Sequence, residues 1–441
     1  MTTSAQAALA ASRGESRGEP AGEPVGAPAA RRQPNRRLVR FLAVFGPGLV
    51  VMLADTDVGS VITAGQSGVQ WGYRLLALQF VLIPILYVVQ ELTVRLGICT
   101  GRGHGELIRE TFGPAWAWVS AAGLGIATLG ALLTEFSGVA GVGELYGLPR
   151  ALTLPIAAAT LLAVVGTGSY RRVERAAIFV GLFELAFFYI AWAAHPDLHA
   201  LLRGAASIPL GNQAYLYLVA ANIGAVIMPW MVFYQQSAIA DKRLRAEHFV
   251  AARWDTALGA AITQLVMAAV LIACAATIGT ATPDASLNTV GEMAGALTPF
   301  LGTAVGNAVF GAGVLGAGMV AAIVASLALA WGLGEVSGYR RSLEYHPLEA
   351  RWFYGVYAVC VIGGCLVVGF WPDLVALNVG VQVMNALLLP VVLGFLIALA
   401  RRALPAPYRL RGGYYALVLA IAALTCGLGV FGGFSGAGLL G

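Results

Sequence analysis

The 441 residues are 59% hydrophobic and only 11% charged, and the mean hydropathy is +0.78. This composition excludes a water-soluble globular protein, because most of the chain must meet lipid. The formal charge of +5 comes from basic residues spread over many segments, so it gives no support to a nucleic-acid partner. The sequence predicts a multi-pass, all-helical membrane protein.

Residues 1–40 are rich in Ala, Gly, Pro, Glu and Arg and contain no long apolar run. This composition predicts a disordered basic tail and not a signal peptide. Arginines between positions 31 and 40 directly precede the first apolar segment. Because cytoplasmic segments collect Arg and Lys, the amino terminus is expected in the cytoplasm of a bacterial-type inner (plasma) membrane.

The first apolar segment, Phe41 to about Gly65, carries Asp55 and Asp57 in its middle. A carboxylate inside a membrane costs about 2.5–3.5 kcal/mol even on the lenient insertion scale. Gly59 weakens the helix beside these acids, which predicts a locally unwound, polar stretch and a cation site. The alternative is that Asp57 only caps the amides of a broken helix.

Runs of about 20 apolar residues predict eleven transmembrane helices. Basic residues concentrate in alternate loops, which fits eleven spans with the carboxyl terminus outside. Ten helices would form a core over residues 41–402, and residues 403–441 would add a loop and the eleventh helix. The predicted spans begin near Phe41, Leu75, Ala115, Ala151, Val173, Ala214, Thr256, Thr303, Phe353, Leu374 and Tyr414.

The sixth span contains Pro229, which removes an amide donor and frees carbonyls near Ala225 and Val226. The first and sixth helices are equivalent members of a five-plus-five inverted repeat. Paired interruptions at equivalent positions of two halves indicate a transport site near the middle of the membrane.

Motifs spread over residues 41–402 carry a family resemblance. They are Gly46-Pro47-Gly48, Trp71-Gly72-Tyr73, Leu96-Gly97-Ile98, Glu106-Leu107-Ile108-Arg109-Glu110, Met228-Pro229, Gln382 and Leu389-Pro390. With these motifs the chain resembles the natural-resistance-associated macrophage protein (Nramp) family of divalent metal transporters, which share the fold of the leucine transporter. The resemblance implies discontinuous first and sixth helices and transport by alternating access.

Counting back from Trp71 places Asp57-Val58-Gly59-Ser60 on the Asp-Pro-Gly-Asn motif of that family. The resemblance then implies that Asp57 is the metal carboxylate and that Ser60 replaces an asparagine ligand. It also implies carbonyl ligands, a thioether that favours Mn, Fe and later metals over Mg or Ca, and a closing glutamine. These further ligands are Ala54, Ala225, Met228 and Gln382.

Two elements that the family links to proton movement are missing, because Trp230 and Leu132 stand in place of a histidine and an aspartate. The resemblance therefore implies metal selection more firmly than proton symport. Trp230 is expected to form a wall of the cavity. Glu135 is retained from the family pattern and is a candidate for proton transfer or for supporting the ligands.

Asp55 and Glu184 lie outside the family pattern. We expect Asp55 beyond the ligand set or in an outer vestibule, since residues two apart do not share a helical face. Glu184 is a hypothetical replacement for the missing proton acceptor. That hypothesis predicts pH-dependent uptake that loses its pH dependence in Glu184→Gln.

The predicted function is secondary transport of a divalent metal, with Mn²⁺-like or Fe²⁺-like ions favoured and proton coupling weakened or altered. The metal is the substrate, and no cofactor or catalytic residue is expected, because the helices hold no nucleophile constellation. The nearest alternative is a Mg²⁺ or broad divalent-cation facilitator, which Asp55, Ser60 and the missing proton elements favour. A permease for a small organic cation or amino acid, stacked on Trp230, is a further alternative.

Overall fold

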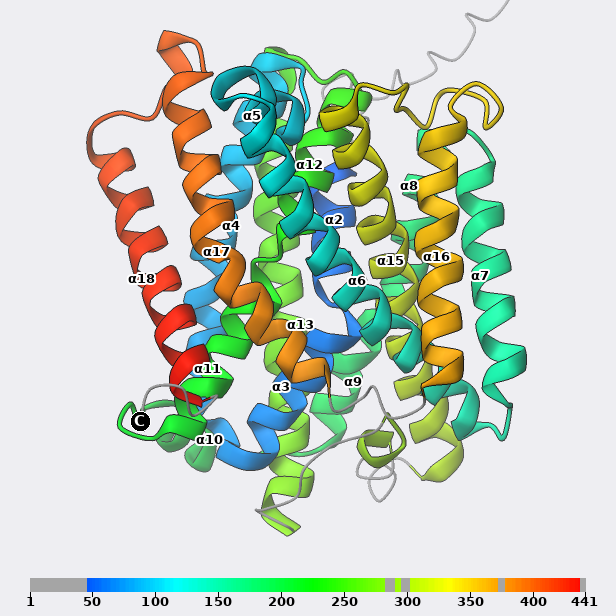
Figure 1. The fold of residues 1–441 in the computed structure, drawn as a ribbon. Coiled ribbons are helices and arrows are strands. Elements are labelled where there is room, and N and C mark those ends of the chain that lie inside the picture. The colour runs from blue at the N-terminus through cyan, green and yellow to red at the C-terminus, as the bar shows by residue number, and fades with distance from the viewer. Residues whose placement is uncertain (1–45, 282–289, 295–301, 372–376, 437–441) are drawn as a thin grey trace, which may run out of the picture. The chain divides into compact units, whose positions relative to one another are not determined.

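The computed structural model describes residues 46–281, 290–294, 302–371 and 377–436, and the regular secondary structure in these ranges is helical (Figure 1). The predicted tail, residues 1–40, lies outside the described residues. The longer helices are α2 (Pro47–Asp55), α3 (Val58–Trp71), α4 (Leu76–Thr100), α5 (His104–Phe112), α6 (Pro114–Leu145), α7 (Arg150–Gly166), α8 (Tyr170–Gly181), α9 (Ala186–Ala193), α10 (Leu198–Ala205), α11 (Gln213–Val226), α12 (Pro229–Asp241), α13 (Phe249–Ala281), α15 (Thr303–Ser337), α16 (Arg351–Phe370), α17 (Leu377–Arg402) and α18 (Gly412–Gly436).

Each of the eleven predicted spans overlaps one of these helices. Within the described ranges, however, only nine helical stretches are long and apolar enough to cross a membrane. The difference arises because α3 and α4 form one run of 43 residues, Val58–Thr100, and because α7 is a shorter apolar helix. The all-helical membrane class is confirmed, whereas the count of eleven is not.

The first span is broken, as predicted. Helix α2 ends at Asp55, and α3 begins at Val58 after two residues outside the helices. Asp57 has an extended backbone, with φ −68° and ψ 167°, and its side chain accepts a hydrogen bond from the Ser60 amide. A helix start leaves its first amides without partners, and an aspartate in this position satisfies one of them. The break therefore consists of Thr56 and Asp57, directly before Val58.

The sixth span is broken in the same way. Helix α11 ends at Val226, Ile227 and Met228 lie outside the helices, and α12 begins at Pro229; Met228 has an extended backbone. Proline fits the first position of a helix, where its missing amide proton is not needed, and it forces the preceding residue into an extended conformation. Pro229 thus ends one helix segment and starts the next.

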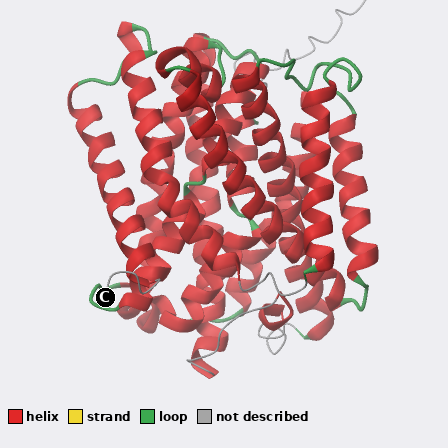
Figure 2. Cartoon of the chain, in the orientation of Figure 1, coloured by secondary structure: helices red, strands yellow, loops and turns green. Residues whose placement is uncertain are grey.

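Both breaks lie inside the bundle. In the α11–α12 stretch, 94% of the most apolar window is buried, against 28% in α18. Figure 2 shows the interruptions as short loop segments surrounded by helices. Within a bilayer, backbone outside a helix is tolerated only where protein or a polar cavity surrounds it. The buried position of both breaks is therefore the one expected in a membrane protein.

Helix α13 contacts α2 from the start of α2 to the break that follows it, and these contacts fix how the two helices align. Asp255 accepts hydrogen bonds from the amides of Gly46 (3.2 Å), Gly48 (2.8 Å) and Leu49 (3.2 Å), at the point where α2 starts. One turn later Gly259 packs against Met52. After a further turn the hydroxyls of Thr56 and Thr263 are 2.7 Å apart. This four-residue step in both helices fixes the position at which the first span breaks.

Gly224 allows α11 and α17 to approach closely. A Cβ added there would overlap the carbonyl oxygen of Gln382 and would lie 2.7 Å from the Ala386 amide nitrogen. Gly224→Ala must therefore push two backbones apart, and we expect it to lower the free energy of unfolding by about 1–3 kcal/mol or more. Thermal unfolding of the purified protein in detergent measures this loss.

Gly394→Ala is the matched control, because it lies on α17 and its added Cβ would meet no atom within 4 Å. Its unfolding midpoint should stay the same or rise slightly, since alanine favours helix. Equal midpoints for the two variants would contradict the close approach of α11 and α17.

Helix α5, outside the membrane-spanning stretches, is fastened to α12 by His104. The Nδ1 atom of His104 is 2.9 Å from Oε1 of Gln236, and the ring packs edge-on against Phe233. Nε2 of Gln236 donates to the Arg102 carbonyl, so Oε1 is the atom left to accept from the ring. Burial lowers the pKa of His104 to about 4, although the hydrogen bond to Gln236 opposes this shift.

Stability should therefore depend on the charge of His104. The unfolded imidazole titrates near 6.5 and the folded one near 4, so between these values the unfolded state binds more protons and stability falls as the pH falls. The full difference amounts to about 3 kcal/mol. Unfolding midpoints from pH 7 to pH 4 should decline less steeply for His104→Gln than for the wild type. The exposed His346 provides a control, and parallel curves for wild type and His104→Gln would refute the assignment.

Candidate functional site

The two helix breaks meet in the interior. The Ser60 hydroxyl, in the first turn of α3, donates a 3.0 Å hydrogen bond to the Ala225 carbonyl in the last turn of α11. These residues are 165 positions apart in the chain, and both are buried. The hydrogen bond brings the two interruptions side by side, so that groups released by both helices face one region.

Asp57 is fully buried and uses one oxygen to cap α3. Oδ1 accepts from the Ser60 amide at 2.6 Å. Oδ2 makes no hydrogen bond of normal geometry to a described residue. The capping interpretation is therefore correct for one oxygen, and it leaves the other available to a cation.

The Ala54 carbonyl lacks its helical hydrogen bond because the amide that would donate to it has another acceptor. In a continuous helix the Val58 amide would donate to it. Instead, this amide donates to Oε2 of Glu135 at 3.1 Å, while Oε1 of Glu135 accepts from the Thr134 hydroxyl at 3.0 Å. Glu135 on α6 thus supports the start of α3, and both of its oxygens are engaged.

The Ala225 carbonyl is released by Pro229. Residue 229 would be its helical donor, and proline has no amide proton. The Ser60 hydroxyl supplies the observed partner. A carbonyl oxygen has two lone pairs, so this hydrogen bond leaves Ala225 with acceptor capacity.

Gln382 reaches the first break from α17. Its side chain packs against Gly59, where an added Cβ would overlap Nε2 and would lie 3.5 Å from Oδ1 of Asp57. Oε1 of Gln382 accepts from Asn385 at 3.0 Å. The amide therefore lies beside the Asp57 cap, and a rotation of its terminal group would turn an oxygen toward this carboxylate.

Met228 and Trp230 flank Pro229 at the second break, and both side chains are fully buried. They belong to the main hydrophobic cluster of the bundle, and Nε1 of Trp230 has no hydrogen-bond partner among the described residues. Leu132, which stands where the resemblance implies an aspartate, is buried in the same cluster.

Asp55 and Glu184 lie near the other side of the first break. Both are buried, so Asp55 does not face an open vestibule in this conformation. Gly181 packs on Leu53, and one turn further along both chains Glu184 lies near Thr56. No oxygen of Asp55 or Glu184 makes a hydrogen bond of normal geometry to a described residue. An unpaired buried carboxylate is costly, which marks both as candidates for function.

Asp57 and Glu135 lie near one another, but the other described carboxylates do not join them in one cluster. In the described part of the chain, no group of three or more His, Cys, Asp or Glu side chains is close enough to hold a metal ion. Any cation at the breaks would therefore need a mixed set of donors: one carboxylate, released carbonyls, and a hydroxyl, amide or thioether.

Two polar features escaped the sequence analysis. Asp255 holds the start of α2, and its presence within an apolar segment was a readable signal. A second set links Ser67, Asn222 and Gln79: Asn222 donates to Ser67 at 2.8 Å and accepts from Gln79 at 2.7 Å. The residues of this second set are single amides and hydroxyls far apart in the chain, so no sequence pattern indicated that they would meet.

These observations define a class of protein: an all-helical membrane protein with the leucine-transporter-like fold, whose first and sixth spans break beside each other. Solved structures share this fold. They include the Eremococcus coleocola manganese transporter, with a TM-score of 0.71, 19% identity and coverage of 92% of this chain and 88% of that one. The nucleobase-cation-symport transporter Mhp1 gives a TM-score of 0.58 at 17% identity, covering 88% of this chain and 90% of its own.

The family model described as natural resistance-associated macrophage protein-like matches residues 48–435, and the chain belongs to the Nramp family. A relative, the divalent metal cation transporter MntH of Agrobacterium fabrum, is 28% identical over 301 aligned positions, and the alignment covers 66% of this chain and 65% of that protein. MntH of Staphylococcus aureus is 30% identical over 226 aligned positions, and the alignment covers 47% of this chain and 48% of that protein. The matches thus span less than two thirds of each of these relatives.

Proposed function

We propose that this protein is a secondary transporter that moves divalent metal cations across the membrane by alternating access, and that it is not an enzyme. The observation that carries the proposal is the meeting of the two breaks through Ser60 and Ala225, next to the free oxygen of Asp57. Family membership and the names of the MntH relatives support it. The metal is the transported substrate, and no cofactor is required.

The metal ligands in this proposal are of three kinds. Asp57 supplies the negative charge, the released carbonyls and the polar side chains supply neutral oxygens, and Met228 supplies a soft sulfur that favours Mn²⁺-like and Fe²⁺-like ions over Mg²⁺ and Ca²⁺. In the present conformation every one of these residues is buried, as expected of a site closed to both sides of the membrane. The ligand set is Asp57, Met228, Ala54, Ala225, Ser60 and Gln382.

A Mg²⁺ or broad divalent-cation facilitator is the second candidate function. It is favoured by the two additional buried carboxyl groups, Asp55 and Glu184, whose oxygens make no hydrogen bond of normal geometry to a described residue. Negative charge beyond Asp57 makes the surroundings harder and suits a strongly hydrated ion. The two candidates differ in whether Mn²⁺ is preferred over Mg²⁺.

Proton coupling is weakened or altered in this proposal. Leu132 and Trp230 cannot exchange protons, and Glu135 has both oxygens in hydrogen bonds to α3 and Thr134. Glu184 is then the candidate proton acceptor, and Asp55 supports the site from outside the ligand set. Trp230 lines the cavity.

The proposed setting is a bacterial-type inner membrane, with a cytoplasmic amino terminus and the carboxyl terminus outside. The distribution of arginines supports this orientation. In this proposal residues 41–402 would form the ten-helix core, and residues 403–441 would add a loop and the eleventh helix, to which α18 corresponds.

Flux into proteoliposomes tests the function. Uptake of Mn²⁺, Mg²⁺ and a panel of organic cations is measured together with internal pH. Saturable Mn²⁺ uptake with little Mg²⁺ uptake supports the main proposal, whereas Mg²⁺ uptake without Mn²⁺ preference favours the facilitator. Uptake of organic cations alone would overturn both.

Loss of pH dependence in Glu184→Gln supports the role of Glu184, and an unchanged pH dependence removes it from the mechanism.

A further inference from the structure

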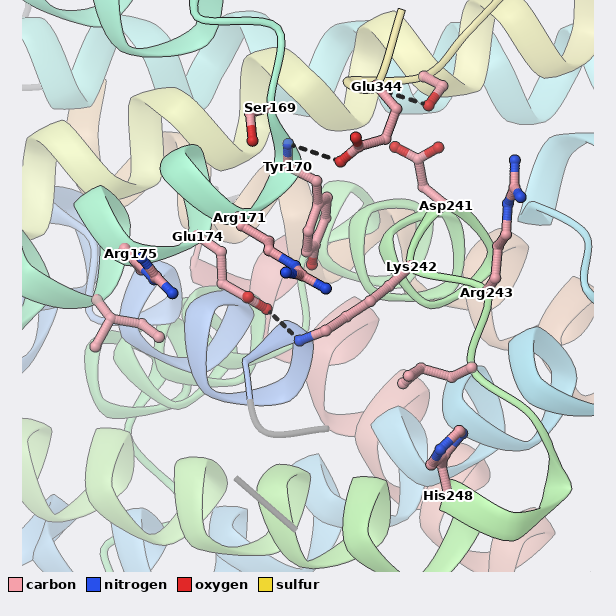
Figure 3. Close-up of a pocket in the computed structure, with 13 residues that line it drawn as sticks. Ser169, Tyr170, Arg171, Glu174, Arg175, Asp241, Lys242, Arg243, His248 and Glu344 are labelled. Atoms are coloured by element: carbon pink, nitrogen blue, oxygen red, sulfur yellow. Dashed lines mark hydrogen bonds and ion pairs between the residues drawn. The ribbon is translucent and has the colours of Figure 1, made fainter. Parts of the chain in front are cut away.

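A large polar cavity opens where α8 begins, away from the helix breaks. Its volume is about 1070 Å³. The start of α8, the end of α12 with the turn that follows, and the loop after α15 line it (Figure 3). The cavity has no part in the proposed metal site, since none of the proposed ligands lines it.

The acidic groups of this cavity already have partners. Glu174 forms a 2.7 Å ion pair with Lys242, which Figure 3 shows in the middle of the cavity. Glu344 accepts from the Tyr170 amide at 3.2 Å, and Asp241 accepts from the Leu343 amide at 3.1 Å. The acids are therefore neutralised or hydrogen-bonded within the protein, and they offer little to a cation.

Three arginines of the cavity remain available. Arg171, Arg175 and Arg243 are exposed, and their side chains form no hydrogen bond or ion pair with a residue that the structure describes. Arg243 has a left-handed backbone, with φ 55°, a conformation that a non-glycine residue adopts at some cost. The first amides of α8 add positive charge at the same place. The cavity thus presents guanidinium groups that suit a phosphate.

The basic end of α8 continues directly into an exposed apolar surface. Arg171, Arg175 and Phe179 follow one another at intervals of four residues and so lie on one face of the helix. Phe183 comes next, and its ring contacts that of Phe179 with centroids 5.7 Å apart. Phe179 is 64% exposed and Phe183 44% exposed. In the span that begins at Tyr170, only 33% of the most apolar window is buried.

We propose that this cavity binds the headgroup of an anionic phospholipid, with the acyl chains lying along α8 against Phe179 and Phe183. Basic cavities between transmembrane helices at the membrane surface are suited to such headgroups. The arginines match the phosphate, and the aromatic stripe matches the chains. A free phosphate or nucleotide would bind the arginines but would make no use of the exposed aromatic side chains.

Native mass spectrometry of the purified full chain, titrated with phosphatidylglycerol or phosphatidylcholine, tests the proposal. The wild type should retain one phosphatidylglycerol molecule more tightly than phosphatidylcholine. Arg171→Gln/Arg175→Gln should weaken this retention about 30-fold, since each arginine near the membrane surface contributes about fivefold. Arg172→Gln is the matched control, because Arg172 is exposed on the same helix and does not line the cavity.

Equal retention by the double variant and by Arg172→Gln would overturn the site. Pyrophosphate that raises the unfolding midpoint as much as phosphatidylglycerol does, or that displaces the bound lipid, would show a free-phosphate site and would overturn the lipid assignment. Phe179→Ala/Phe183→Ala should also weaken retention, and no effect would refute the path of the acyl chains. If a variant does not fold, a photoactivatable phosphatidylglycerol on the wild type decides: label in residues 170–183 supports the proposal, and label elsewhere refutes it.

Discussion

Asp57→Asn should abolish saturable Mn²⁺ uptake, with a loss of at least about 100-fold, while the protein still folds. Asparagine keeps an oxygen that can accept from the Ser60 amide, so α3 retains its cap. The substitution removes the negative charge that a divalent ion needs when it leaves water. Outer partners of metal ligands alone contribute about 10–100-fold, and a direct ligand should contribute more.

Proteoliposome uptake of Mn²⁺, together with the unfolding midpoint, separates the two roles of Asp57. Asp55→Asn is the control, because Asp55 is equally buried and only two residues away, yet lies outside the proposed ligand set. It should reduce uptake far less. Normal Mn²⁺ uptake by Asp57→Asn, or equal losses in both variants, would show that the carboxylate at position 57 is not the metal ligand.

Met228→Ala should lower the preference for Mn²⁺ over Ca²⁺ and Mg²⁺ roughly tenfold, because it removes the one soft member of the proposed ligand set, in which the other donors are oxygens. Its effect on total flux should be smaller than its effect on the ratio, since water can take the vacant position. Competition of Ca²⁺ and Mg²⁺ against radioactive Mn²⁺ uptake measures this ratio.

Met231→Ala is the matched control for Met228→Ala. Met231 is also fully buried on α12, but it lies within the first turn of the helix, past the break. Both variants delete the same atoms and leave a similar cavity, with a similar cost in stability. Only Met228→Ala should change the selectivity. An equal change in both variants would assign the effect to packing and would remove Met228 from the ligand set.

The breaks in the first and sixth spans were predictable because their causes are local. Pro229 cannot continue α11 whatever surrounds it, and the stretch from Asp55 to Ser60 competes with helical hydrogen bonds through its own side chains. The same locality explains why helices lie at all eleven predicted positions. The number of separate spans could not be predicted in this way, because the turn between α3 and α4, Gly72–Leu75, is itself a short 3-10 helix and joins the two into one helical run.

The partners of the released groups were not predictable. The sequence indicated that Ala225 would lose its donor, but not that the Ser60 hydroxyl would replace it. It marked Glu135 as a candidate for proton transfer, and the structure has this carboxylate holding the Val58 amide. It left Asp255 unnoticed, although this residue holds the start of α2.

The sequence by itself determined the membrane class, the helices, the two interruptions and the family, because hydropathy, helix-breaking residues and motifs act over a few neighbouring positions. The tertiary structure alone decided that the two interruptions touch, that Asp57 keeps one oxygen free, and that the arginines of α8 border a cavity. These features depend on hydrogen bonds and packing between residues more than 70 positions apart in the chain, and such contacts form only when the helices pack side by side.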